Sequence, residues 1–197
     1  MKILTSNKVK IEEIKRIVGD KIEFGEGKDL PEVDGNIDQV ILYKSLEAGK
    51  DIVVEDTILA LIDEDGNIIK EIVDIKWKIN ELKEGQRVKW ITSLGYNDGK
   101  NIKVYRGFIN GVITKEHGDE GFAFDPYFIP SILLKSNNVK TLYELNEEGK
   151  KDDFSARKNA LINLMNKEEI YSTKISEIPK WNGRYQNEEV EKNYIIL

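Results

Sequence analysis

Hydrophobic and polar positions in the first 56 residues predict alternating strands and helices. Short apolar runs bounded by polar residues are typical of strands, and apolar residues spaced three or four positions apart are typical of helices. The strands are expected at residues 2–5, 21–25 and 51–56, and the helices at residues 6–19 and 35–50. This order predicts a partly parallel sheet covered by helices.

The middle of the chain has the pattern of antiparallel strands. The sequence DEDGN at residues 63–67 predicts a hairpin turn. Residues 87–113 predict a strand, a turn at Asp98-Gly99 and one or two further strands. A short helix is expected at residues 75–85, and a longer one at residues 154–167. On the longer helix, the expected apolar face consists of Phe154, Leu161 and Met165.

The domain organisation follows from the length and from the weakly patterned end. With 197 residues, the chain suits one domain. We expect that domain at residues 1–166, followed by an extension at residues 167–197. The extension is polar, and its pattern fits either a docked tail or a surface for a partner.

Composition excludes several classes of partner and site. A net charge of -6 makes a global attraction to nucleic acid or to an anionic membrane unexpected. No apolar run is long enough for a membrane span, and the first residues lack a signal peptide pattern, so we expect a cytoplasmic protein. The chain has no cysteine and one histidine, His117, which makes disulfides impossible and makes catalytic triads and multi-histidine zinc sites unexpected. Chemistry must therefore come from carboxylates, lysine, arginine, hydroxyls, backbone amides and a hard metal ion.

The segment IVVEDTILALID, residues 52–63, places Glu55 and Asp56 inside an apolar run. Ionised carboxylates are rarely buried unless they are paired or bind a cation. At the carboxyl end of a parallel strand, a carboxylate can hold Mg²⁺ beside phosphates or accept a proton from water. The alternative is a buried ion pair with a lysine.

Two lysines are candidate phosphate ligands. Lys10 follows the loop that begins at Thr5, where a strand leads into a helix whose first amides can bind an anion. The alternative is an ordinary helix cap with surface lysines. Lys44 falls on the same apolar stripe as Ile41. It either extends to solvent or reaches a buried anion.

Two further loops are ambiguous on their own. Glu32, which follows Pro31, is either a solvated acid or a site residue. The segment GFAFDP, residues 121–126, has small and aromatic residues that suit a planar ring such as a purine, or a tight loop with core aromatics.

Six segments occur together in an order that resembles the inosine triphosphate pyrophosphatase family. TSNKVK resembles the Thr-Gly-Asn-x-x-Lys loop of that family, and GFAFDP resembles its Gly-Phe-Gly-Tyr/Trp-Asp-Pro loop. The match runs from about residue 2 to residue 165. The other segments are DLPEVDGNIDQVILYKSLEA, VVEDT, IKW and KKDDFSARKNAL.

The resemblance implies a fold, a reaction and a set of site residues. The fold would be a two-lobed α/β structure, with an elongated mixed β-sheet flanked by helices and the nucleotide cleft between the lobes. The reaction would be Mg²⁺-dependent hydrolysis of non-standard purine nucleoside triphosphates (ITP, dITP, XTP) to monophosphate and pyrophosphate by a homodimer. In this family pattern, Glu32 and Asp56 would bind Mg²⁺, and Asp56, helped by Glu55, would deprotonate the attacking water. Phosphates would be bound by Thr5, Asn7, Lys10 and Lys44, and the nucleoside by Thr57, Lys76, Phe122, Ala123, Phe124, Asp125, Lys151 and Arg157.

The sequence departs from the family pattern at three places, and the last two, in the cleft wall and at the base site, concern the substrate more than the reaction. Ser6 stands where the family has glycine, and Ala156 stands where it has the histidine of Ser-His-Arg. The expected Gly-Gly-x-Pro-Gly segment after the acidic strand is replaced by DEDGNIIKEIVD. The alternatives are therefore a phosphatase or pyrophosphatase of another nucleotide or phosphometabolite, and a nucleotide-binding protein without catalysis.

Overall fold

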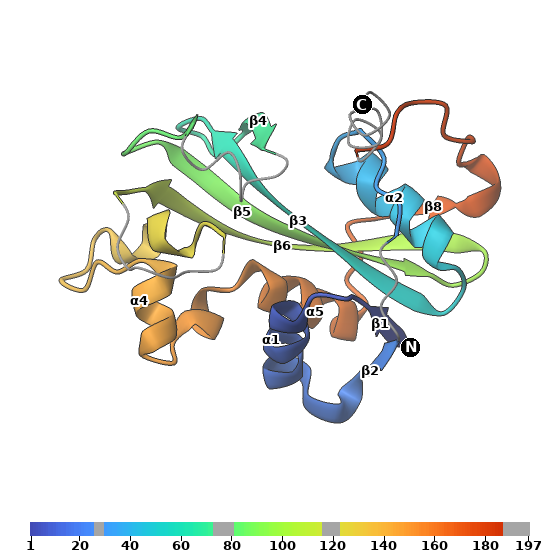
Figure 1. Ribbon diagram of the computed structural model, residues 1–197, viewed down its shortest axis with the longest axis horizontal. Helices are drawn as coiled ribbons and strands as arrows, with labels where there is room; N and C mark the ends of the chain where they lie inside the picture. Colours follow the sequence, from blue (N-terminus) through green and yellow to red (C-terminus); the bar gives the residue numbers. More distant parts are fainter. Residues whose placement is uncertain (26–29, 73–80, 116–122, 187–197) are drawn as a thin grey trace, which may run out of the picture. The chain divides into compact units, whose positions relative to one another are not determined.

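The computed structural model describes residues 1–25, 30–72, 81–115 and 123–186. In this part of the chain, eight strands form one mixed sheet in the order β2-β1-β3-β5-β6-β7, with β4 paired to β3 and β8 paired to β6 (Figure 1). The strands are β1 (Lys2–Leu4), β2 (Glu23–Gly25), β3 (Ile52–Ile62), β4 (Ile68–Ile72), β5 (Arg87–Asn97), β6 (Asn101–Ile113), β7 (Phe128–Pro130) and β8 (Tyr171–Lys174). The mixed α/β fold predicted from the sequence is confirmed.

The helices are mostly short. The α-helices are α1 (Lys8–Val18), α2 (Ile37–Ala48), α4 (Leu142–Glu147) and α5 (Ala156–Asn166). The 3-10 helices are η1 (Gly19–Lys21), η3 (Asp125–Tyr127), η4 (Ser131–Leu133), η5 (Lys151–Phe154) and η6 (Ile175–Glu177). None of the helices described is long and apolar enough to cross a membrane. Most of the helix expected at residues 75–85 lies outside the described residues.

The strand–helix–strand–helix–strand opening is confirmed. β1 pairs in parallel with both β2 and β3, and Leu4 is opposite Val54 in the second pairing. α1 begins at the cap residue Asn7, and α2 begins at Asn36, which forms a capping box with Gln39. The helices therefore begin where the cap chemistry of the sequence places them.

The acidic pair does not end its strand, contrary to the prediction of a strand at residues 51–56. β3 has 11 residues and continues to Ile62. The parallel pairing with β1 ends at Val54, and β3 later pairs with β4 in antiparallel fashion from Leu59. Residue 55 is thus the first after the parallel segment, and the apolar residues that follow belong to the same strand. The hairpin predicted at residues 63–67 joins β3 to β4 and is confirmed, since Asn67 donates its backbone N–H to the carboxylate of Asp63.

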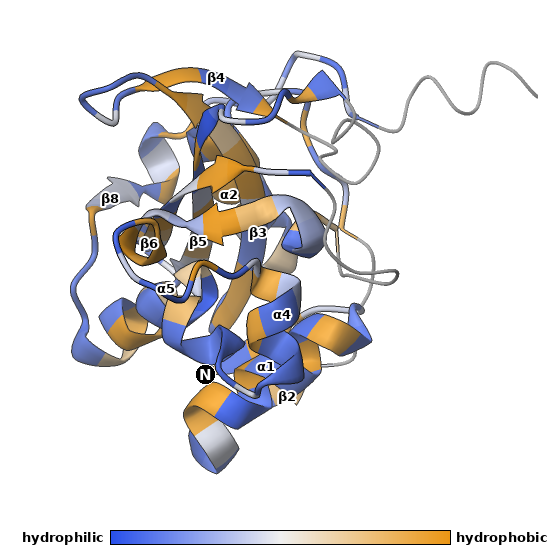
Figure 2. Ribbon diagram, turned by 90° about the vertical axis from the view of Figure 1, so that its left-hand side faces the viewer, coloured by the Kyte–Doolittle hydropathy of each residue, from blue (hydrophilic) through white to orange (hydrophobic). Residues whose placement is uncertain are grey.

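The chain divides into two compact units. Unit 1 comprises Met1–Asp56, Ser93–Arg106 and Leu161–Leu197, and unit 2 comprises Thr57–Thr92 and Gly107–Ala160. Many residues of the strands are hydrophobic, whereas hydrophobic and hydrophilic residues alternate along the helices (Figure 2). This pattern is the one expected for amphipathic helices packed on a sheet.

In unit 1, α1 and α2 lie on opposite faces of the sheet (Figure 1). The core beside α2 includes Ile41, Val54 and Val104, all at 0% exposure. α2 approaches β5 closely at Gly95, where an added Cβ would lie 2.0 Å from Oγ of Ser45. Glycine is therefore required at this point of contact.

In unit 2, the core is built around aromatic rings. Phe124 packs edge-on against Trp90, with ring centroids 5.6 Å apart, and also contacts Phe128. The apolar face expected for the last helix is partly wrong, because Met165 is 38% exposed and Phe154 belongs to η5. The residues of α5 that are buried are Ala156, Arg157, Ala160, Leu161 and Leu164.

The described part of the extension, residues 167–186, is docked on unit 1. β8 pairs in antiparallel fashion with β6, from Tyr171 opposite Val104 to Lys174 opposite Asn101. η6 follows β8, and the chain then passes beside α2 (Figure 1). Of the two alternatives left open by the sequence, this part of the chain adopts the docked tail.

Candidate functional site

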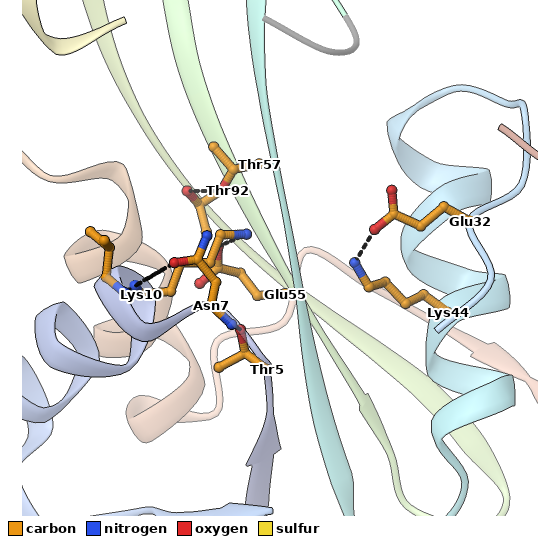
Figure 3. A network of polar contacts seen from close by, with 9 residues as sticks. Thr5, Asn7, Lys10, Glu32, Lys44, Glu55, Thr57 and Thr92 are labelled. Atoms are coloured by element: carbon orange, nitrogen blue, oxygen red, sulfur yellow. Dashed lines mark hydrogen bonds and ion pairs between the residues drawn. The ribbon is translucent and has the colours of Figure 1, made fainter. Parts of the chain in front are cut away.

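The first loop of unit 1 is held by its own side chains. The hydroxyl of Thr5 accepts a hydrogen bond from the backbone N–H of Asn7 at 3.3 Å. The side-chain oxygen of Asn7 accepts from the backbone N–H groups of Val9 at 3.0 Å and Lys10 at 3.3 Å. These contacts fix the start of α1 and thereby the position of Lys10 (Figure 3).

Lys10 forms an ion pair with Glu55. The ammonium nitrogen lies 3.0 Å from Oε1 of Glu55, and the two side chains are 20% and 1% exposed. The register of β1 and β3 explains the contact, because Leu4 lies opposite Val54. The loop that leads to Lys10 follows Leu4, and Glu55 follows Val54, so the two begin side by side. The ion-pair alternative for the acidic pair is therefore realised at Glu55.

Lys44 forms the second ion pair of this region, with Glu32. The Lys44 side chain is only 14% exposed, so it does not extend into solvent as lysines on apolar stripes commonly do. Figure 3 shows this pair on the α2 side of β3 and the Asn7 loop on the other side. Burial opposes the charged form of Lys44, but the carboxylates of Glu32, Asp56 and Glu55 outweigh it and raise the pKa above its ordinary value.

Asp56 is directed toward the Lys44 side of β3. Successive side chains of a strand point to opposite faces, and Glu55 contacts Lys10 on the other face. Burial raises the pKa of the Asp56 carboxyl, an effect that the charge of Lys44 opposes and that of Glu32 reinforces. The adjacent carboxylates thus have different lysine partners, a separation that the sequence did not indicate.

The charges of this cluster suit a divalent cation. Three carboxylates (Glu32, Glu55 and Asp56) lie near two lysines, which leaves a net negative charge, and the partial burial of Asp56 disfavours its ionised form. No group of three or more His, Cys, Asp or Glu side chains with the geometry of a metal site occurs among the described residues. Mg²⁺ commonly binds to one or two carboxylates together with water and substrate phosphates, so Glu32 and Asp56 fit such a site.

Unit 2 contains a second group of the expected site residues. The hydroxyls of Thr57 and Thr92 lie 3.0 Å apart, and Thr92 is fully buried. The Lys151 ammonium contacts the carboxylate of Asp125, and both side chains are less than 10% exposed. Neither Thr92 nor the pairing of Lys151 with Asp125 was predicted, because the partners lie 35 and 26 residues apart in the sequence.

The GFAFDP loop is partly described. Ala123 has a positive φ of 55°, and Phe124 is 5% exposed inside the core, as in the core-aromatic alternative. Phe122 and Lys76, both expected to bind the nucleoside, lie outside the described residues, as does His117.

Arg157 and Ala156 are both buried at the start of α5. Arg157 is 3% exposed and Ala156 is 0% exposed. β6 passes so close to this helix that a Cβ added at Gly107 would lie 2.2 Å from the carbonyl oxygen of Ala156. The position that is histidine in the family pattern is thus enclosed by packed backbone and side chains in this chain.

Comparison with known proteins gives consistent matches over most of the chain. A family model described as Ham1 family matches residues 1–167. A dITP/XTP pyrophosphatase of Saccharolobus solfataricus is 30% identical over 196 aligned residues, which cover 87% of this chain and 95% of that relative. An inosine triphosphate pyrophosphatase of Schizosaccharomyces pombe is 27% identical over 146 residues, covering 65% of this chain and 76% of the relative. Among solved structures, the Ham1 protein of Staphylococcus aureus has the same fold, with a TM-score of 0.56 and 23% identity over 85% of this chain and 97% of that protein.

Proposed function

Since the chain belongs to the Ham1 family, we propose that it hydrolyses non-standard purine nucleoside triphosphates, such as ITP, dITP and XTP, to monophosphate and pyrophosphate in the presence of Mg²⁺. Its relatives are named as pyrophosphatases of such substrates, so the chain is a hydrolase acting on acid anhydrides. The observation that carries the proposal is the cluster of unit 1, where Lys10 and Lys44 lie against Glu55 and Glu32 beside the half-buried Asp56.

The two lysines would bind the phosphates. A triphosphate brings several negative charges. A metal ion could bind to the Glu32 carboxylate in place of the Lys44 ammonium. Lys44 would then turn from Glu32 to a phosphate oxygen, and Lys10, at the start of α1, would add a second ammonium group. Thr5 and Asn7 would keep the loop in place through the hydrogen bonds described above.

Asp56 would orient and deprotonate the attacking water. The water oxygen forms a bond to phosphorus, its proton passes to the Asp56 carboxylate, and the bond to the leaving pyrophosphate breaks. Mg²⁺ held by Glu32 and Asp56 would neutralise charge on the phosphates. Burial favours proton uptake by Asp56, since it raises the pKa of that carboxyl.

In unit 2, Lys151 and Arg157 would recognise the base. Arginine only donates hydrogen bonds, so it can pair with the 6-oxo group of inosine or xanthine and not with the 6-amino group of adenine. Asp125 would hold the Lys151 ammonium in place. Thr57 follows Asp56 in the sequence, and its hydroxyl is held by that of Thr92. Thr57 would contact the nucleotide.

The decisive experiment is pyrophosphate release from a panel of nucleoside triphosphates with Mg²⁺. Release from ITP, dITP and XTP is expected, with slower release from ATP, whose base carries a 6-amino group. Activity confined to other nucleotides or phosphometabolites would establish the alternative enzyme class. Binding of ITP with no release from any substrate would establish a nucleotide-binding protein without catalysis.

A further inference from the structure

The end of the described chain lies against the loop that carries Glu32. We call residues 179–186 the C-terminal strap. The strap lies beyond residue 167, where the match to the family model ends. The family match therefore does not reach it.

Hydrogen bonds join the strap to three successive residues, Glu32, Val33 and Asp34. The N–H of Gln186 donates to the carbonyl oxygen of Glu32 at 2.9 Å, and the N–H of Asp34 donates to the carbonyl oxygen of Arg184 at 2.9 Å. Between them, Tyr185 forms an antiparallel bridge with Val33. The side-chain amide of Gln186 adds a hydrogen bond to the carbonyl oxygen of Val33 at 3.1 Å.

The strap is also anchored to α2. Trp181 packs edge-on against Tyr43, with ring centroids 5.0 Å apart. The Tyr43 hydroxyl donates to the carbonyl oxygen of Pro179 at 2.8 Å, and the Trp181 indole N–H donates to the carbonyl oxygen of Arg184 at 3.0 Å. Tyr43 and Lys44 are neighbours on α2, so the strap is held by the same helix that supplies the partner of Glu32.

The carbonyl oxygen of Glu32 thus accepts a hydrogen bond from the strap. We propose that the C-terminal strap positions Glu32 for binding of the divalent cation, with Gln186 as the main positioning residue. The inference rests on the proposed metal role of Glu32. Partners that orient a metal ligand commonly alter metal affinity by about 10- to 100-fold when they are lost.

The test compares two shortened chains. A chain that ends at Gln186 keeps every described contact of the strap, whereas a chain that ends at Lys180 lacks Trp181, Arg184, Tyr185 and Gln186. Isothermal titration calorimetry with Mg²⁺ and a non-hydrolysable ITP analogue measures metal affinity, and hydrogen exchange measures protection of the Asp34 amide. Melting temperature measures stability separately.

Two substitutions in the full-length chain isolate the backbone contact. Gln186→Pro removes the N–H that donates to Glu32, and Gln186→Ala removes only the side-chain amide. Tyr185, the residue before it, lies in a strand-like bridge, which is the conformation that a following proline favours. Both variants lose the Gln186 side-chain amide, and only Gln186→Pro also loses the backbone N–H. The difference between the two variants therefore measures the contribution of that one donor.

The expected result is a weaker Mg²⁺ affinity, by about tenfold, and faster exchange at Asp34 in the chain that ends at Lys180. The chain that ends at Gln186 should match the full-length protein, and Gln186→Pro should weaken Mg²⁺ binding more than Gln186→Ala. A lower melting temperature with unchanged Mg²⁺ affinity would overturn the inference, because it would make the strap a stabilising element only. A full-length protein that binds Mg²⁺ and the analogue but releases no pyrophosphate would refute the proposed function, and the effect of the strap on Mg²⁺ affinity could still be compared. An Mg²⁺ affinity that is unaffected by Glu32→Gln would refute the inference.

Discussion

The ammonium of Lys10 lies 3.0 Å from a carboxylate oxygen of Glu55, whose side chain is 1% exposed. On the opposite face of β3, the half-buried Asp56 has Lys44 as its strongest opposing charge. Two consecutive acids on one strand are thus each matched with a lysine from a different helix. We expect removal of Lys10 to affect mainly the stability of the fold, and removal of Lys44 to affect mainly the binding of the substrate.

Lys10→Met should lower the free energy of unfolding. Removing one partner of a buried ion pair leaves an uncompensated charge, and such changes cost about 3–5 kcal/mol when both groups are fully buried. Because Lys10 is 20% exposed, we expect about 2 kcal/mol at pH 7, less than this range. Urea unfolding measures the change, and Lys8→Met at an exposed position of the same helix is the matched control. Equal stability of the two variants would contradict a structural role of the pair.

Asp56→Asn should abolish turnover and preserve the fold. The amide cannot accept a proton from water, and the loss of a general base typically costs about 10²- to 10⁴-fold in rate. The pKa of Asp56 is raised in the folded protein, so its charge opposes folding at neutral pH and its removal should leave the melting temperature unchanged or raise it. Steady-state kinetics with ITP and thermal unfolding test both parts, with Asp65→Asn in the exposed hairpin as control. A near-normal rate would refute the assignment of Asp56.

Local patterns were sufficient to predict the elements around these residues, but not their partners. Asn7, Asn36 and Gly19 mark helix ends through cap chemistry that acts within a few residues. The apolar stripe of α2 includes Lys44, yet its spacing cannot tell whether a lysine turns to solvent or to Glu32, because that choice depends on a loop that precedes the helix. The bridge from Val33 to Tyr185 joins residues more than 150 positions apart, and nothing in the polar composition of the extension indicated it.

Lys44→Met should weaken triphosphate binding and lower stability less than Lys10→Met does. Methionine occupies similar apolar space on α2. The partner Glu32 is 33% exposed, so water can solvate it when the ammonium is lost. We expect a rise of about tenfold or more in the KM for ITP, since a hydrogen bond to a charged group is worth about 1.5–3 kcal/mol. Lys50→Met, at an exposed lysine just beyond the helix, is the control. An unchanged KM and turnover number would show that Lys44 does not act on the substrate.

Asp98→Ala should lower stability in a way that depends on pH. Backbone N–H groups of Asn101 and Lys100 donate to Asp98 and lower its pKa to about 2. A depressed pKa means that the ionised group stabilises the fold above its unfolded pKa of about 3.9 and that this contribution is lost as the pH falls toward 2. The difference in stability between wild type and variant, about 1 kcal/mol at pH 7, should therefore shrink between pH 4 and pH 2. Urea unfolding at several pH values measures it, and a difference that stays constant would contradict the assignment.

Arg157→Lys should reduce the preference for ITP over ATP. A lysine keeps the positive charge but loses the planar set of donors through which an arginine can pair with a 6-oxo group. Loss of one specific hydrogen bond is worth about 0.5–1.5 kcal/mol, so the ratio of kcat/KM for ITP to that for ATP should fall about 2- to 10-fold. Because Arg157 is 3% exposed, the melting temperature must be measured alongside, and Lys158→Arg at the next position of α5 serves as a control that leaves the buried guanidinium in place. Ala156→His is not expected to sharpen the preference, since Ala156 is fully buried and added volume in a packed core typically costs about 1–3 kcal/mol. A selectivity ratio that is unchanged in Arg157→Lys, with a folded and active protein, would remove Arg157 from base recognition and leave Lys151 as the described cation to test in its place.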